Sequence, residues 1–455
     1  MTGNDRQRRL PSDRRFWALV GLVCLVFVAI WLSTVGETLT HDEAIYIDIA
    51  EHPFHSSFYP GEVFLRHPPL GLALLSAWNG LGLMARAWPL VWTLGGLLVL
   101  GDAIRRSGGS PAWLLPVVLA APAAIPLVTV TLYPPMFAFL SLAAWGWAAD
   151  RRDIEVAGWN LAVFTHELAL LVLACVLAPR AVAIAREGWQ AWRAWGRLVQ
   201  PYPAALAWGV VMVAYLATPA DGRGQYLATL DDPAPNVASI VRMTAWVGLV
   251  ILATAGPLLV DPRRGTDERE HGITLATAAA VVAAPFYRYV LPLLPTLATL
   301  RARDPPRWWG RRGWAVLAGA ALVATGLSLG AIVTGQDTVN AANTPGLVDH
   351  EDAVGLIEPG ETVVVRSTPS FARVLEDRGW RIAATAATGP STVEMTRDGD
   401  RIVMHRAETY ERLHEVDGVD AVVFPTSWTN VPGDLPEGPW VHAGEAGGAT
   451  RWEPR

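Results

Sequence analysis

The chain of 455 residues contains no lysine, so all of its 36 basic residues are arginine. Cysteine is almost as scarce, because only Cys24 and Cys175 occur and both lie in apolar runs, where a thiol usually packs as a small hydrophobe. Disulfides and zinc or redox motifs built on cysteine and histidine are therefore excluded. The sequence has no P-loop, no strand followed by a GxGxxG loop and no internal repeat, so nucleotide binding by its C-terminal part has no support.

Charge is also sparse. Charged residues make up 17% of the chain, whereas hydrophobic residues make up 52% and the mean hydropathy is +0.28. This composition is typical of a polytopic membrane protein with a smaller soluble part. The net charge of -6 combines basic loops in the apolar portion with an acidic balance in the C-terminal part, which argues against nucleic acid as a partner.

Residues 16–35 form the first apolar run, long enough to cross a hydrocarbon core of about 30 Å at about 1.5 Å per helical residue. The arginines in residues 1–15 resemble the positive flank of a signal peptide, but the run is too long and no small-residue cleavage site follows it. We therefore expect a cytoplasmic tail over residues 1–15 and a transmembrane domain over residues 16–334, with a first outer loop over residues 36–85.

Arginine-rich loops give the expected topology, because such loops stay on the cytoplasmic side. The clusters lie at residues 105–106, 151–152, 180–197, 263–269 and 301–312. Single crossings are then expected over residues 90–104, 112–130, 136–149, 204–218, 237–260 and 313–333.

Two apolar runs have arginine-rich loops at both ends, so each is expected to be a hairpin of short or half-membrane helices. These are residues 156–179 and 273–300, with outer apices near residues 164–167 and 285–289. Residues 70–83 are too short to span and are expected to lie at the outer surface. The prediction is a mainly α, polytopic bundle of about 9–12 spanning or half-spanning helices.

The pattern changes after residue 334 to short β-branched or alternating runs interleaved with helical segments, which predicts a small α/β domain over residues 335–455. Strands are expected at residues 362–366, 381–385, 401–405 and 421–424, helices at residues 370–377 and 409–416, and a polar linker at residues 337–345. The domain follows an outward crossing, so we expect it on the extracytoplasmic side.

Asp42 and Glu43 follow the first apolar run. They are either solvated loop residues or a catalytic pair, since a partly desolvated carboxylate gains basicity and can accept a proton from an alcohol. Downstream, Arg66 and His67 precede Pro68 and Pro69; the prolines suit the start of a helix, and a cation held there can pair with a lipid phosphate.

Two further constellations lie in apolar surroundings. His166 and Glu167 are ionisable groups in an apolar run, which indicates either function or a pair that holds the bundle together. Arg288 is flanked by Tyr287 and Tyr289; a guanidinium matches phosphate oxygens bidentately, and the alternative is an arginine that snorkels beside an aromatic belt.

Taken in order, these motifs resemble the GT-C membrane glycosyltransferases, in the branch that contains protein O-mannosyltransferases and the lipid A aminoarabinose transferase. The resemblance covers roughly residues 16–300. Its motifs are Asp42-Glu43-Ala44-Ile45-Tyr46, His67-Pro68-Pro69-Leu70 with Leu81-Gly82 and Arg86, Phe164-Thr165-His166-Glu167-Leu168-Ala169-Leu170, and Arg288-Tyr289-Val290-Leu291-Pro292-Leu293-Leu294-Pro295.

The resemblance implies an inverting transfer of a hexosyl or pentosyl group from a polyprenyl (dolichyl-type) phosphate to an acceptor hydroxyl, on the extracytoplasmic face. Asp42 stands at the general-base position, with Glu43 beside it. Arg66, His67, Arg288 and Tyr289 stand where the donor lipid phosphate is bound, and Tyr46, His166 and Glu167 would support the polar site.

Family members often carry lysine before the paired prolines and after the threonine, whereas this chain has His67 preceded by Arg66, and His166. Cations around a phosphate that leaves as a stable anion could replace a metal, so no metal or cofactor is expected. The expected partners are the lipid-linked donor, a protein, lipid or glycan acceptor, and membrane lipids.

A transporter or lipid flippase is the alternative from another class, because it also uses broken helices and buried charges. The polar groups gather toward one face and no repeat is evident, which favours an enzyme. An inactive scaffold whose outer domain binds a partner is a third interpretation. The enzyme prediction requires the separated motifs to meet in one pocket at the outer rim of the bilayer.

Overall fold

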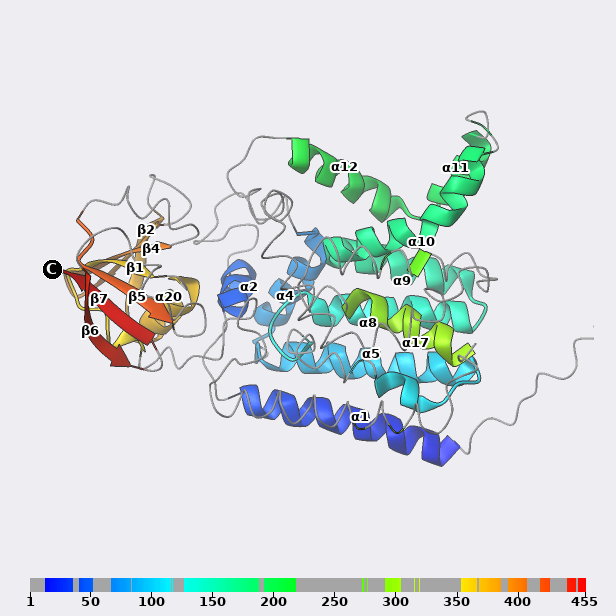
Figure 1. Cartoon of the computed structure of the whole chain (residues 1–455), viewed down its shortest axis with the longest axis horizontal. Coiled ribbons are helices and arrows are strands. Elements are labelled where there is room, and N and C mark those ends of the chain that lie inside the picture. The colour runs from blue at the N-terminus through cyan, green and yellow to red at the C-terminus, as the bar shows by residue number, and fades with distance from the viewer. Residues whose placement is uncertain are drawn as a thin grey trace, which may run out of the picture. The chain divides into compact units, whose positions relative to one another are not determined.

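The structure is a computed structural model of the whole chain (Figure 1). The residues it describes are 13–35, 41–51, 67–82, 84–115, 117, 127–186, 188, 192–217, 272–273, 276, 291–303, 315, 319, 353–365, 368–385, 392–406, 418–425, 440–446 and 449–455.

Contacts divide the chain into two compact units. The helical unit comprises residues 1–31, 64–74 and 86–327, and the mixed unit comprises residues 32–63, 75–85 and 328–455. The mixed unit therefore takes in part of residues 36–85, the expected first outer loop, as well as the C-terminal region.

The helical unit is built from apolar helices that pack side by side (Figure 1). Its elements are α1 (Asp13–Thr34), the start of α4 (Pro69–Gly80), α5 (Ala87–Arg106), the 3-10 helix η1 (Pro111–Leu114), α8 (Tyr133–Ala148), α9 (Arg152–Thr165), α10 (Glu167–Arg186), α11 (Trp192–Val199), α12 (Pro203–Ala217) and α17 (Leu294–Arg303). Helix α8 packs against α5, α9 and α17, and α9 packs against α10 and α12.

Among the described residues, three helices are long and apolar enough to cross a membrane: Arg14–Leu32, Ala87–Arg106 and Glu167–Arg186. Helix α1 is apolar on all sides but buries one stripe, formed at spacings of three and four residues by Phe16, Val20, Val23, Phe27 and Ile30. Its other side exposes Leu19, Leu22 and Leu25 by 49%, 56% and 65%. A helix that is apolar all round and only half covered is suited to a lipid environment.

Glycines let α8 and α9 approach closely. A Cβ on Gly158 would lie 2.5 Å from the backbone N of Ala143, and one on Gly146 would lie 2.3 Å from the backbone N of Glu155. Small residues at such crossings are characteristic of helix packing in membranes, where close backbone approach provides much of the attraction.

The mixed unit contains α2 (His41–Glu51), α20 (Thr368–Asp377) and a sheet. In the described part of the chain the sheet has the order β2-β3-β4-β1-β5-β7-β6. Its strands are β1 (Thr362–Val365), β2 (Arg381–Thr385), β3 (Thr392–Arg397), β4 (Asp400–Arg406), β5 (Ala421–Pro425), β6 (Trp440–Ala446) and β7 (Ala449–Pro454). Strand β1 is parallel to β4 and β5, and the other pairs are antiparallel.

Alternation along the strands separates two faces of this sheet. Val363, Val365, Met404 and Val423 point into a core that also contains Phe371 of α20. An ion pair ties β7 to the start of β1, since the guanidinium of Arg451 donates to both carboxylate oxygens of Glu361.

Several predicted elements are confirmed. Helices occur at residues 16–34, within 90–104, at 136–148 and at 204–217, and the break expected near residues 164–167 falls at His166. Helix α10 differs from the prediction, because its 20 residues qualify it as a full-length span and not as a short helix.

The crossing expected over residues 112–130 lies only partly within the described residues, because residues 116 and 118–126 are not described. It begins as a 3-10 helix, and residues 128–132 form turns and bends. The crossing at 237–260, the apex at 285–289, the linker at 337–345, the helix at 409–416 and most of the crossing at 313–333 lie outside the described residues.

We expect Gly158→Ala to lower the stability of the helical unit by about 1–3 kcal/mol, because the new methyl group overlaps the backbone of α8. The matched control is Gly95→Ala on α5, where a Cβ meets nothing within 4 Å. Thermal unfolding of the detergent-purified chain would measure the difference. Equal unfolding temperatures for the two variants would contradict the close α8–α9 crossing.

Candidate functional site

Three of the sequence-predicted residues meet in the helical unit. The Nδ1 atom of His67 lies 3.1 Å from Oε2 of Glu167, and Nδ1 of His166 lies 3.2 Å from the same oxygen. The side chain of His166 is 3% exposed, and those of His67 and Glu167 are each 12% exposed. One carboxylate oxygen is therefore shared by two imidazoles that come from motifs 100 residues apart.

A break in the chain places His166 and Glu167 at this point. Helix α9 ends at Thr165, His166 has extended backbone angles (φ -154, ψ 134), and α10 begins at Glu167. The backbone N–H of Leu168 donates to Nδ1 of His166 at 3.3 Å, so this side chain caps α10. Such a cap uses the neutral ring with its proton on Nε2, whereas donation to Glu167 requires a proton on Nδ1.

The start of α4 packs tightly against this break. A Cβ on Gly71 would lie 2.9 Å from the carbonyl oxygen of Thr165 and 3.0 Å from Cδ2 of Leu132. Only glycine allows this approach without displacement. Because Pro68 and Pro69 stiffen the chain just before Gly71, the position of His67 is coupled to the position of the break.

Tyr133 belongs to the same cluster and is missed by the sequence prediction. Its ring centroid lies 4.6 Å from that of His166, and it is 4% exposed. The turn before it is held by Trp88, whose Nε1 donates to the carbonyl of Thr131 at 3.1 Å. The signal that could have found it is Tyr133-Pro134-Pro135, since the paired prolines start a helix here as Pro68 and Pro69 do before α4.

The acidic pair lies in α2 of the mixed unit. Asp42 is in the first turn of α2, and Glu43 is 0% exposed. Tyr46 and Asp48 are 7% and 6% exposed. A fully buried glutamate costs free energy unless it has partners, and Glu43 has interactions within the structure. The expected outer loop is thus a buried helix at this point.

An ion pair fixes α2 to the C-terminal region. Arg373 of α20 donates from Nη1 to Oε2 of Glu51 at 2.8 Å and from Nη2 to Oε1 at 3.1 Å, a bidentate arrangement. Burial alone would lower the pKa of Arg373, but the hydrogen bonds and charge of Glu51 and the charges of Glu376 and Asp377 raise it. Helix α2 therefore belongs structurally with α20.

The pKa of Glu376 is affected by the negative charges that lie close together between these helices. Burial raises the pKa of Glu376 above its usual value, Arg373 partly opposes this, and the charges of Asp48, Glu51 and Asp377 raise it further. A raised pKa in the folded state stabilises the fold at low pH, and this contribution is lost as the pH rises through it. The bidentate bond from Arg373 offsets the repulsion at neutral pH.

The structure thus brings His67, His166 and Glu167 together, and it places Asp42, Glu43 and Tyr46 in the other compact unit. Arg66, Arg288 and Tyr289 lie outside the described residues, and so does the side chain of Asp42. The single pocket expected from the sequence stays a prediction. Within the described residues, no group of three or more His, Cys, Asp or Glu side chains is arranged to hold a metal ion.

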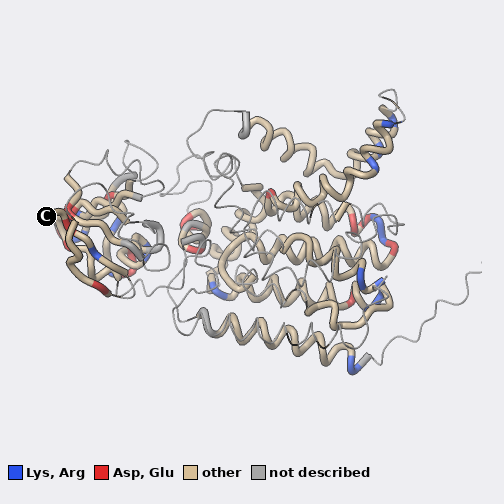
Figure 2. The backbone as a smooth tube through the Cα atoms, viewed as in Figure 1, with Lys and Arg blue, Asp and Glu red and all other residues tan. Residues whose placement is uncertain are grey.

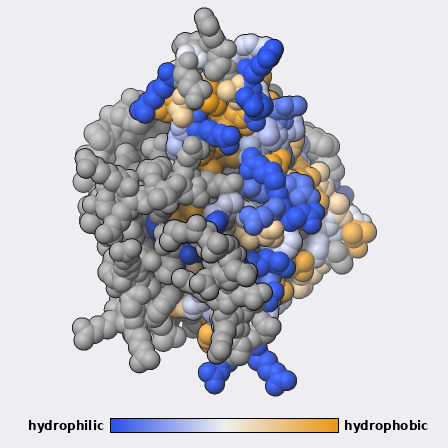
Figure 3. Space-filling model, turned by 90° about the vertical axis from the view of Figure 1, so that its right-hand side faces the viewer, coloured by the Kyte–Doolittle hydropathy of each residue, from blue (hydrophilic) through white to orange (hydrophobic). Residues whose placement is uncertain are grey.

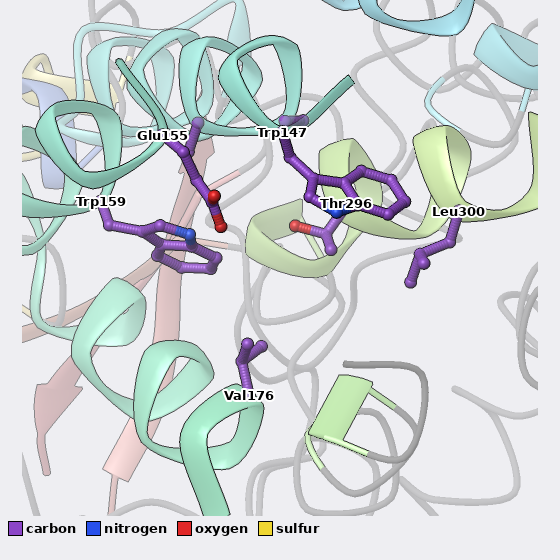
Figure 4. A pocket seen from close by; sticks show the side chains of 8 residues that line it. Trp147, Glu155, Trp159, Val176, Thr296 and Leu300 are labelled. Atoms are coloured by element: carbon purple, nitrogen blue, oxygen red, sulfur yellow. The ribbon is translucent and has the colours of Figure 1, made fainter. Parts of the chain in front are cut away.

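A hollow lies between α8, α9, α10 and α17 (Figure 4). Glu155 and Trp159 of α9 face it together with Trp147 of α8 and Thr296 of α17. Glu155 lies eleven residues before His166 on α9, a separation of about 16 Å along a helix axis. Its carboxylate accepts a hydrogen bond from Nη1 of Arg152 at 3.0 Å. This hollow is therefore separate from the histidine–glutamate cluster.

No family model and no curated protein sequence matches this chain. Among solved structures, the chain is similar to the crystal structure of ArnT from Cupriavidus metallidurans bound to undecaprenyl phosphate. The sequence identity is 16%, the TM-score is 0.48, and the alignment covers 96% of this chain and 97% of that chain. At this level the similarity assigns no activity to the chain.

We expect Arg373→Glu to loosen α2, because it replaces a bidentate ion pair with repulsion beside Glu51 and Glu376. Hydrogen–deuterium exchange of the peptide that contains residues 41–51 should become faster by about tenfold or more. The double variant Arg373→Glu with Glu51→Arg should recover part of the protection. Unchanged exchange in the single variant would show that the ion pair does not hold α2.

Proposed function

We propose that this protein is a membrane glycosyltransferase that moves a sugar from a polyprenyl-phosphate donor to an acceptor hydroxyl on the extracytoplasmic face. The acceptor oxygen forms a bond to the anomeric carbon while the bond from that carbon to the phosphate oxygen breaks. The hydroxyl proton passes to Asp42, and the lipid phosphate leaves as an anion. Attack from the side opposite the phosphate inverts the anomeric configuration.

The observation that supports the proposal best is the meeting of His67, His166 and Glu167. They come from two of the motifs that resemble the GT-C glycosyltransferases, and they converge at a helix break beside a span-length apolar helix. Ionisable groups in such surroundings cost several kcal/mol unless they are paired or hydrated, and they commonly mark a functional site.

Histidine suits a phosphate-binding role in a chain without lysine. A protonated imidazole donates hydrogen bonds from both nitrogens, and Nδ1 of each ring faces the same oxygen of Glu167. In the proposal, His67 binds the donor phosphate together with Arg66, Arg288 and Tyr289. His166 and Glu167 then orient His67, and Tyr133 packs against His166.

Asp42 is the proposed general base, and Glu43 and Tyr46 are the proposed supporting polar groups on α2. The docking of α2 onto α20 gives the C-terminal region a role in this scheme. Movement of that region would carry α2 with it. A protein, lipid or glycan acceptor held by the C-terminal region would therefore meet its base on the same rigid segment.

The direct test is transfer of a labelled sugar from a polyprenyl phosphate in reconstituted vesicles. We expect label to appear in an acceptor with the wild-type chain, and Asp42→Asn to reduce the rate by at least 100-fold, because the isosteric amide cannot accept the proton. Asp153→Asn is the control, since Asp153 is an exposed carboxylate paired with Arg151 on the arginine-rich end of α9.

Two outcomes would contradict the proposal. Wild-type activity in Asp42→Asn would remove Asp42 as the base. Movement of the intact labelled lipid across the bilayer without transfer of the sugar would instead identify a flippase, which shares broken helices and buried charges with the proposed enzyme.

Gly71→Ala should reduce transfer by about 10- to 100-fold, because its methyl group pushes the start of α4 away from Thr165 and moves His67. Gly80→Ala lies on the same helix, where a Cβ meets nothing within 4 Å, and it should keep full activity. Initial rates at saturating donor would be compared for the two variants. Equal rates would show that the approach of α4 to the break does not set the geometry of the site.

A further inference from the structure

Most arginines of the helical unit collect at one end of it (Figure 2). Arg106 at the end of α5 lies over Trp145 of α8, with its guanidinium carbon 5.0 Å from the ring centroid. Arg303 at the end of α17 lies 5.3 Å from the ring of Trp147. Arg152 at the start of α9 donates to the hydroxyl of Tyr202, just before α12, at 3.0 Å. These contacts bring the C-terminal ends of α5, α8 and α17 and the N-terminal ends of α9 and α12 to one side of the helical unit.

Two groups of arginines at this end differ in their partners. In the first, each guanidinium has a carboxylate within the helical unit: Arg105 and Arg106 bind Asp102, Arg151 binds Asp153, and Arg152 binds Glu155. The second group lies on α10 and α11 and comprises Arg180, Arg186, Arg193 and Arg197, all exposed. Among the described residues, none of these four forms an ion pair with a carboxylate. Within the described part of the chain, α10 and α11 therefore carry four positive charges that no described carboxylate pairs with.

Helix α11 separates its polar and apolar residues. Arg193 and Arg197 are four residues apart and share one side, whereas Trp192, Trp195 and Leu198 follow each other at intervals of three. Trp192 is 69% exposed, and Arg193 stacks over its ring with the guanidinium carbon 5.2 Å from the centroid. Leu198 is buried at 7%. Such a helix, basic on one side and rich in tryptophan on the other, is suited to lie in a membrane interface.

The connections of α11 agree with that position. It follows α10, which is long and apolar enough to span, and it precedes the apolar helix α12. Its ends are therefore attached to two helices whose apolar surfaces suit the hydrocarbon core. Figure 3 shows this end of the molecule, where hydrophilic and apolar residues lie side by side at the level of α11.

We propose that α11 and the adjacent end of α10 form a docking surface for the headgroups of anionic phospholipids. The guanidinium groups of Arg193 and Arg197 would bind phosphate oxygens, and Trp192 would lie at headgroup depth. A nucleic acid offers similar phosphates but no apolar layer to receive Trp192, so lipid is the occupant that matches both sides of the helix. This surface is independent of the proposed sugar transfer.

The test uses the full chain in nanodiscs of phosphatidylcholine with a rising fraction of phosphatidylglycerol. Lipids retained by the protein after extraction into mild detergent are counted by native mass spectrometry. We expect wild type to retain phosphatidylglycerol preferentially, and Arg193→Gln with Arg197→Gln to weaken this preference on the order of 30-fold, from two lost cationic contacts. The preference of the wild type should also fall with rising salt.

Two matched variants separate charge from structure. Arg193→Lys with Arg197→Lys keeps both charges and should retain most of the preference. Arg381→Gln with Arg401→Gln removes two exposed arginines from the sheet and should leave lipid retention unchanged. The proposal is overturned if the α11 glutamine variant retains as much phosphatidylglycerol as wild type, if the sheet variant loses as much as the α11 variant, or if the wild type shows no preference for anionic lipid.

Discussion

The cost of placing an ionisable group among apolar helices governs the helical unit. Wherever such a group lies inside the described part of that unit, a nearby residue offsets its cost. His67 and His166 share one oxygen of Glu167, and Asp102 receives Arg105, Arg106 and the indole of Trp145. The arrangement around Asp102 only stabilises the C-terminal end of α5 against α8. The first arrangement lies at a helix break and joins two distant segments, which is why we place the donor phosphate there.

A second constraint lies in the mixed unit, where α2 is bound to α20 through Glu51 and Arg373. A short helix of 11 residues is marginal in water by itself. Burial of Ile49 and Ala50 and the bidentate ion pair stabilise it. The acidic pair is thus held by the C-terminal region. If Asp42 is the base, the C-terminal region contributes to catalysis by holding the helix that carries it.

Much of the architecture could be predicted from the sequence, because apolar length and arginine position are local signals. The first apolar helix, the break at His166 and the strand Arg381–Thr385 all follow from them. Strands β3, β6 and β7 were not predicted, since sequences such as TVEMTR and WVHAGEA contain few apolar β-branched residues and depend on hydrogen bonds from neighbouring strands. In the site, the sequence placed His67 and Glu167 on one face. The sharing of one Glu167 oxygen by His67 and His166, and the contact of His166 with Tyr133, depend on tertiary packing, which no local pattern encodes.

Photolabelling tests the central claim most directly. A polyprenyl-phosphate sugar that carries a photoreactive group beside the phosphate would be irradiated with the full chain in vesicles, and the labelled peptides would be identified by mass spectrometry. The account predicts label in the peptides that contain His67 and His166-Glu167, and competition by unlabelled donor. Label confined to the lipid-facing side of α1 or α5, with none near His67 or His166, would contradict it.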